Sequence, residues 1–179
     1  MLQITVPGGE LLNEKTNEFI TMNPQILQLE HSLISISKWE AKWKKPFLSK
    51  TEKTNEESRD YIRCMTLNNV DSNTYVFLTK NNVEEINAYM TNPMTATTIN
   101  DRGASKKSNE TITSELIYYW MIAANIPMEC QKWHINRLLM LIRVCGAKNA
   151  PEKKMSRSAI MSQNKAINDA RRARLKTSG

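Results

Sequence analysis

Cys130 and His134 have the residue types and the spacing for metal or thiol chemistry. Side chains four residues apart share one face of an α-helix, where two ligands can reach one metal ion, and a cysteine beside a histidine can act as an activated nucleophile. Two ligands are too few for a metal site, and the other histidine of the chain, His31, is distant in sequence. A cysteine on an apolar helical face is also more often unreactive than catalytic. We therefore predict that Cys130, His134 and Cys145 bind no catalytic metal.

The sequence carries no signature of an enzyme. The phosphate-binding pattern GxxxxGK[ST], the dinucleotide-binding pattern GxGxxG, the zinc-protease pattern HExxH and the hydrolase pattern GxSxG are all missing. Cys64, Cys130 and Cys145 form neither a disulfide framework nor a CxxC metal pattern, which indicates reduced thiols in a cytoplasmic protein. We predict a protein that is not an enzyme and uses no cofactor.

The apolar residues are distributed for a folded core rather than for a membrane. The chain is 40% hydrophobic and 24% charged, which is the balance of a sequence that folds. No apolar run reaches the roughly 18 residues of a membrane span, and the N-terminus lacks a charged segment followed by a hydrophobic one. Membrane insertion and secretion are therefore not expected.

The strongest physical signal is the basic C-terminal segment. Residues 152–179 hold eight Lys or Arg and two acidic residues, so they carry six of the seven net positive charges of the chain. The residues alone leave three interpretations open: the cations neutralise nucleic-acid phosphates, they pair with carboxylates of an acidic protein surface, or they lie on a solvated helix. The cations that we assign to partner binding are Arg157, Lys165, Arg171, Arg172 and Arg174.

Most core-forming side chains fall within residues 113–146, which predict a helical hairpin. Thr113 or Ser114 can cap the first helix, and Pro127 suits the first position of the second. Gly146 fits the left-handed residue that ends the second helix. The predicted core of the hairpin consists of Tyr119, Trp120, Trp133, Leu138 and Leu141.

The first 99 residues predict an N-terminal α+β region. The runs at residues 2–6, 18–22 and 26–31 have the composition of strands in a small antiparallel sheet, in which the second run returns beside the first after a turn at residues 7–9. An amphipathic helix begins near Leu33 and ends before Pro46, because its apolar residues recur every three or four positions.

Further along this region the capping signals predict two more helices. Thr54 and Glu57 form a capping box before one helix, and Thr79 caps another. Residues 71–78, between them, are expected to form one or two helical turns.

The predicted fold is α+β and predominantly helical: a small N-terminal antiparallel β element, a helical middle, a C-terminal helical hairpin and a basic terminal helix. Residues 100–112 are mostly small or polar, which predicts a linker or loop between the region 1–99 and the hairpin 113–146. Residues 147–179 form the basic tail, in which Ser156 caps the last helix.

The last helix is predicted to have a narrow apolar stripe, while its other faces carry the cations. Such a stripe buries little area, so we expect a partner to complete the helix. The residues of the stripe are Ala159, Ile160, Ala166, Ile167, Ala170 and Ala173.

Five stretches, which together extend over nearly the whole chain, resemble a family of tailed-bacteriophage proteins encoded among the tail morphogenesis genes. They are residues 28–40, 93–98, 117–122, 131–139 and 155–172. The family is similar to the tail assembly chaperones, which bind the tape measure protein and hold it soluble while tail tube subunits polymerise around it.

The resemblance implies a non-enzymatic chaperone in the cytoplasm of the infected bacterial host. Its expected partners are phage tail proteins, above all the tape measure protein, and self-association of the chain is left open. The first alternative is a structural virion protein of the tail or neck, located in the virion. The second is a nucleic-acid-binding regulator, which only the basic tail supports.

Overall fold

The computed structural model describes residues 1–13, 17–99, 111–149 and 157–175. They belong to two compact units, Met1–Ala147 and Lys148–Gly179. The described residues form six α-helices, two short 3-10 helices and four strands, which confirms the predicted α+β and mostly helical fold. No helix among these ranges has both the length and the apolar character to cross a membrane.

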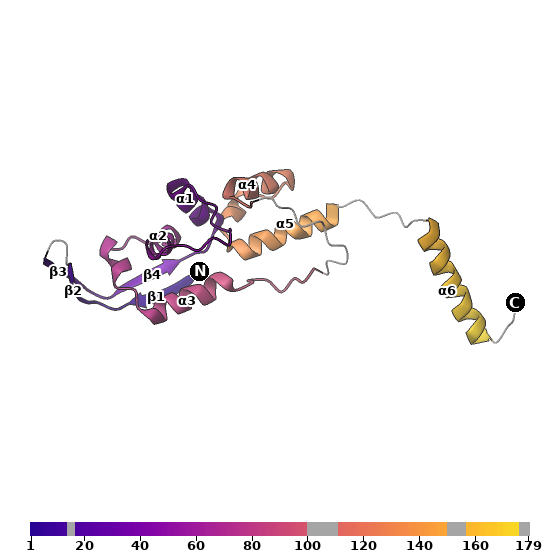
Figure 1. The fold of residues 1–179 in the computed structure, drawn as a ribbon, viewed down its shortest axis with the longest axis horizontal. Helices are drawn as coiled ribbons and strands as arrows, with labels where there is room; N and C mark the ends of the chain where they lie inside the picture. Colours follow the sequence, from indigo (N-terminus) through magenta and orange to yellow (C-terminus); the bar gives the residue numbers. More distant parts are fainter. Residues whose placement is uncertain (14–16, 100–110, 150–156, 176–179) are drawn as a thin grey trace. The chain divides into compact units, whose positions relative to one another are not determined.

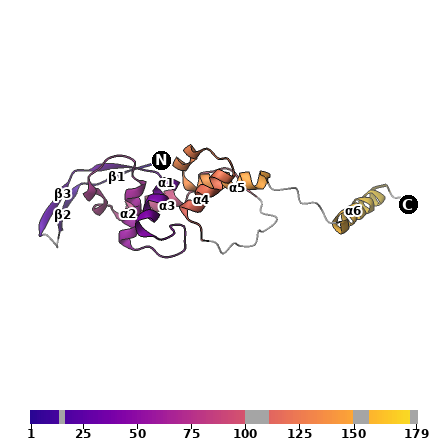
Figure 2. The ribbon, with the colours of Figure 1, turned by 90° about the horizontal axis from the view of Figure 1, so that it is seen from above.

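The strands form two separate antiparallel pairs. β1 (Leu2–Val6) pairs with β4 (Gln25–Leu29), so that Leu2 lies opposite Leu29. β2 (Gly9–Asn13) pairs with β3 (Glu18–Met22) in a ribbon that extends beyond the helices of its unit (Figures 1 and 2). The three predicted strand regions are therefore confirmed, but the predicted pairing of the second with the first is wrong.

The strand β2 was missed because it has no alternating pattern. Leu11 and Leu12 are adjacent in sequence and are both exposed, at 40% and 49%. Every residue of β2 whose burial the structure describes is exposed, and a strand without a buried face leaves no period of two in its sequence. Gly9, which was assigned to a turn, is instead the first residue of β2.

Three helices build the core together with the β1–β4 pair. They are α1 (Leu33–Trp43), α2 (Asn55–Met65) and α3 (Lys80–Thr91). The helix α3 packs against β1, and α1 packs against α2. The predicted caps are confirmed: Thr54 and Glu57 form a capping box at α2, and Thr79 caps α3. The predicted helical turns at residues 71–78 correspond to the 3-10 helix η1 (Ser72–Val76).

Polar contacts join α1 to α2 on the rim of the core. The indole Nε1 of Trp39 donates to the backbone carbonyl of Glu57, and the indole Nε1 of Trp43 donates to the Asp60 carboxylate, both at 2.9 Å. Lys42 pairs with the same Asp60 carboxylate at 2.6 Å. These bonds fix the angle at which the two helices meet.

The second half of the unit is not the simple hairpin that was predicted. α4 (Ser114–Ala123) is capped by Thr113, as expected, and packs against α1. A short 3-10 helix, η2 (Met128–Lys132), follows Pro127, and a new helix, α5 (Ile135–Asn149), begins after a break. The predicted second helix is therefore two elements.

The break between η2 and α5 has a tertiary cause. His134 forms an isolated antiparallel bridge with Ser32, and the N–H of Ile135 donates to the carbonyl of His31 at 2.7 Å. These contacts pull the backbone out of the helix that the apolar periodicity predicts. Gly146 does not end the helix, because its backbone is not left-handed and α5 continues to Asn149.

The predicted core of the hairpin is correct for Leu138, which is fully buried, and wrong for Tyr119, which is 63% exposed. The buried face of α4 carries Ile117 and Met121. Tyr119 lies two residues from each of them, on the opposite side of the helix. The other predicted core residues, Trp120, Trp133 and Leu141, are partly buried against the core.

The second unit contains α6 (Arg157–Leu175), which confirms the predicted terminal helix. Every side chain that the structure describes on α6 is exposed. The predicted Ser156 cap lies outside the described residues, as do positions 100–110 of the predicted linker.

Candidate functional site

The cations assigned to partner binding all lie on α6. None of them forms an ion pair with a carboxylate within the described residues. The helix has five cations and one acidic residue, Asp169, which gives it a net charge of +4. Its basic side chains, all exposed, are Arg157, Lys165, Arg171, Arg172 and Arg174.

Two isoleucines and two arginines share one face of α6. Ile160 and Ile167 are seven residues apart, about two helical turns, and they are 44% and 42% exposed. Arg171 and Arg174 follow on the same side, four and seven residues after Ile167. The prediction that the cations occupy other faces than the apolar stripe is therefore wrong for these two arginines.

Cys130 and His134 do not share a helical face. Cys130 is buried in η2, whereas His134 lies in the break before α5. In the part of the chain that the structure describes, no group of three or more His, Cys, Asp or Glu side chains is placed to hold a metal ion. The continuous helix that would place the two side chains on one face is interrupted between η2 and α5.

Backbone groups engage both ring nitrogens of His134. Nε2 lies 3.1 Å from the carbonyl oxygen of Tyr89, and because a carbonyl only accepts, Nε2 carries the proton. Nδ1 accepts from the N–H of Asn136 at 3.3 Å. The imidazole is therefore held as the neutral Nε2–H tautomer, and its lone pair is already used.

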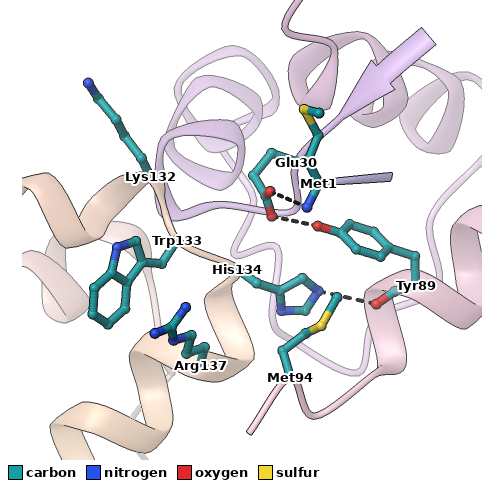
Figure 3. A pocket seen from close by; sticks show the side chains of 8 residues that line it. All are labelled: Met1, Glu30, Tyr89, Met94, Lys132, Trp133, His134 and Arg137. Atoms are coloured by element: carbon teal, nitrogen blue, oxygen red, sulfur yellow. Dashed lines mark hydrogen bonds and ion pairs between the residues drawn. The ribbon is translucent and has the colours of Figure 1, made fainter. Parts of the chain in front are cut away.

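His134 forms part of the wall of a pocket of about 260 Å³ (Figure 3). On one side of this pocket the Glu30 carboxylate accepts from the Tyr89 hydroxyl at 2.7 Å and pairs with the Met1 amino group at 2.8 Å. Burial raises the pKa of the Tyr89 hydroxyl, and the bond to Glu30 adds to the rise. The polar groups on this side satisfy one another.

The opposite side of the pocket presents cations and an aromatic ring. The guanidinium of Arg137 lies 4.3 Å from the centre of the Trp133 ring, a cation–π contact. Lys132 also lines the pocket, and its side chain extends away from His134 (Figure 3). These side chains do not converge on one point, so they do not form a catalytic arrangement.

His31 packs against His134. The two rings meet edge to face with their centres 5.1 Å apart, and Nδ1 of His31 is 2.5 Å from the hydroxyl of Tyr61. Burial lowers the pKa of His31 from 6.5 to about 3, and the nearby His134 adds to the shift. Burial also lowers the pKa of His134, although its bond to the Tyr89 carbonyl opposes the shift. Both rings are therefore neutral near pH 7.

This polar cluster was not predicted from the sequence. His31 follows β4 and His134 precedes α5, so only the folded chain brings them together. The residue types gave only a weak signal of this contact. A buried histidine needs a hydrogen-bond partner, and the chain has only two histidines. With its bonds satisfied internally, the cluster supports a structural role. No protein-family model, no curated protein and no solved structure matches this chain.

Proposed function

We propose that this chain is a non-enzymatic assembly protein of a tailed bacteriophage, a chaperone that holds the tape measure protein during tail tube assembly. The observation that carries the proposal is α6, a 19-residue helix whose described side chains are all exposed. In proteins most of the stability of a helix comes from the packing of its apolar face against other elements. A helix with exposed isoleucines therefore gains stability when a partner covers it.

The mixture of side chains on α6 favours a protein partner over nucleic acid. Ile160 and Ile167 offer apolar area to a helical partner, and Arg171 and Arg174 on the same face can form paired hydrogen bonds with carboxylates. Binding to phosphates requires the arginines but makes no use of exposed isoleucines. A tape measure protein, which is long and helical with extensive apolar faces, fits this combination.

The satisfied polar groups of the first unit support a binding role rather than a catalytic one. The imidazole of His134 is held by two backbone groups, and the Glu30 carboxylate is held by Tyr89 and Met1. A general base needs a free lone pair within reach of a substrate proton. The lone pair of the His134 imidazole is already used, and each oxygen of the Glu30 carboxylate is engaged by Tyr89 or Met1. The proposal places the protein in the cytoplasm of the infected host.

Mass spectrometry of purified virions tests the proposal against its main alternative. A chaperone leaves when the tail tube is complete, so we expect the chain in the infected-cell lysate and not in the virion. Its presence in the virion at a stoichiometric copy number contradicts the chaperone proposal and supports a structural protein of the tail or neck.

A further inference from the structure

The first unit has a groove on its surface between α2 and α3. The two helices border a groove of about 360 Å³. Its floor consists of core residues, among them Tyr61, which is 2% exposed, and Ile86, which is 1% exposed. The groove opens to solvent beside these core side chains, so apolar side chains of a partner can reach the edge of the core there.

The lining residues give the groove the shape of a helix-binding site. On α2 they are three and four positions apart, and on α3 they span seven positions. Seven residues of α-helix are about 10 Å long, so both walls run for two turns. Grooves that bind amphipathic helices receive side chains at the same spacings of three, four and seven. Besides Tyr61 and Ile86 on the floor, the lining residues on the two helices are Asn55, Ser58, Ile62, Val83, Asn87 and Met90.

Lys53 gives the groove its charge preference. Its ammonium lies 4.6 Å from the centre of the Phe47 ring, and Lys53 lines the groove itself. Within the described residues it forms no ion pair, because the nearby Glu57 carboxylate is already bonded to Lys45 and to the N–H of Thr54. Burial lowers the pKa of Lys53, and the charge of Glu57 only partly offsets this. A partner carboxylate would stabilise this desolvated cation.

We propose that the groove between α2 and α3 binds an acidic amphipathic helix of a partner protein. The apolar side chains of that helix enter between Ile62 and Val83, and one of its carboxylates pairs with Lys53. The basic helix α6, from this chain or from a second copy, is the wrong occupant because it brings cations toward Lys53. The inference rests on the proposed function for the class of partner, a helical protein, and adds a second site to it.

Binding of a helical peptide to the full chain tests the groove. The probe is a fluorescein-labelled, hydrocarbon-stapled peptide with leucines three, four and seven positions apart and glutamates beside them. The control peptide carries glutamine in place of every glutamate. Fluorescence anisotropy measures both affinities in a background with Arg171→Gln, Arg172→Gln and Arg174→Gln, which removes three cations of α6. We expect the acidic peptide to bind more tightly than the control peptide.

Groove variants then locate the binding. Val83→Glu should weaken the acidic peptide at least tenfold, and Asn87→Trp, which fills the groove, should do the same. The control Val76→Glu, at a valine that is 45% exposed and does not line the groove, should leave the affinity unchanged. Lys53→Met should lower the affinity of the acidic peptide to that of the control peptide and should leave the affinity of the control peptide unchanged.

Three results would overturn the inference: neither peptide binds, Val83→Glu binds as the control does, or Lys53→Met leaves the preference for glutamate intact. Self-association of the chain that Val83→Glu abolishes would assign the groove to a second copy and would also overturn it. These outcomes are independent of the virion measurement, so the groove and the proposed function can fail separately.

Discussion

The imidazole rings of His31 and His134 meet edge to face with their centres 5.1 Å apart, and both are buried. This contact joins the start of the α1 segment to the break before α5, where Ile135 also donates to the carbonyl of His31. Tyr61 and Tyr89 hold the two rings from α2 and α3. The pair therefore links elements from both halves of the first unit, and the link requires neutral histidines.

Acid should destabilise the first unit through this pair. The pKa of His31 is about 3 in the folded chain and about 6.5 in the unfolded chain, so between these values the unfolded state binds more protons. Stability is therefore complete above about pH 6.5 and falls with decreasing pH, by about 1 kcal/mol per pH unit for this one group. Urea unfolding followed by tryptophan fluorescence, at about pH 7 and about pH 5, measures the loss.

The variant His31→Gln is the control for this pH dependence. It removes the titrating group, so the slope between about pH 7 and about pH 5 should become smaller. A variant with the slope of the wild type would contradict the assignment to His31, whatever its absolute stability.

Leu138 and Tyr119 should respond very differently to truncation, although both were predicted as core residues. Leu138 is fully buried, so Leu138→Ala should cost about 2 to 5 kcal/mol of unfolding free energy. Tyr119 is 63% exposed, so Tyr119→Ala should change stability by no more than about 0.5 kcal/mol. Urea unfolding measures both losses. Equal losses for the two variants would contradict the exposed position of Tyr119 on α4.

The buried Glu40 side chain should be needed as a double hydrogen-bond acceptor. One of its oxygens accepts from the N–H of Phe47 and the other from the N–H of Ser114, each at 2.7 Å, so it ties the loop after α1 to the N-terminus of α4. Glu40→Gln turns an amide NH₂ toward one of these donors and should cost about 1 to 3 kcal/mol. The exposed Glu56→Gln is the matched control, and similar unfolding midpoints for the two variants would argue against the link.

Nucleic-acid binding by α6 should be weak. A mobility-shift assay with DNA and RNA at near-physiological salt should show little retention, and modest added salt should abolish it, because the binding is only electrostatic. Tight binding that is lost in a variant with Arg171→Gln, Arg172→Gln and Arg174→Gln would support a nucleic-acid-binding regulator. It would also contradict the assembly role of this helix.

Local signals in the sequence were sufficient for the parts of the fold that depend on neighbouring residues. The capping box of Thr54 and Glu57 and the end of α1 before Pro46 could be predicted because a hydroxyl, a carboxylate or a proline acts within one helical turn. β1 could be predicted because one of its faces is buried and leaves an alternating pattern.

Distant contacts account for what the sequence did not reveal. The helix expected through Cys130 and His134 is broken by a bridge to Ser32, a contact with no trace in the local pattern. Apolar spacing on α4 was compatible with several faces, and only packing against α1 selects the one with Ile117. The groove between α2 and α3 likewise depends on how two helices meet, which residue spacing within each helix does not determine.

The helix that carries the predicted partner-binding cations of the tail could be predicted from the sequence. A single terminal helix with a narrow apolar stripe gives a strong periodic signal, because α6 needs no long-range contact to form its pattern. Which partner covers Ile160 and Ile167 depends on a surface outside this chain.

Co-expression with the proposed partner, a phage tape measure protein encoded in the same genome, tests the proposed assembly role of α6 most directly. The fraction of tape measure protein that stays soluble and co-purifies should be high with the wild-type chain and should fall strongly when Arg171, Arg172 and Arg174 are all changed to Gln. A variant of equal charge change on the first unit, with Gln at the exposed Lys38, Lys50 and Arg59, should behave as the wild type. Equal solubility with and without the chain, or full activity of the α6 variant, would contradict the proposal.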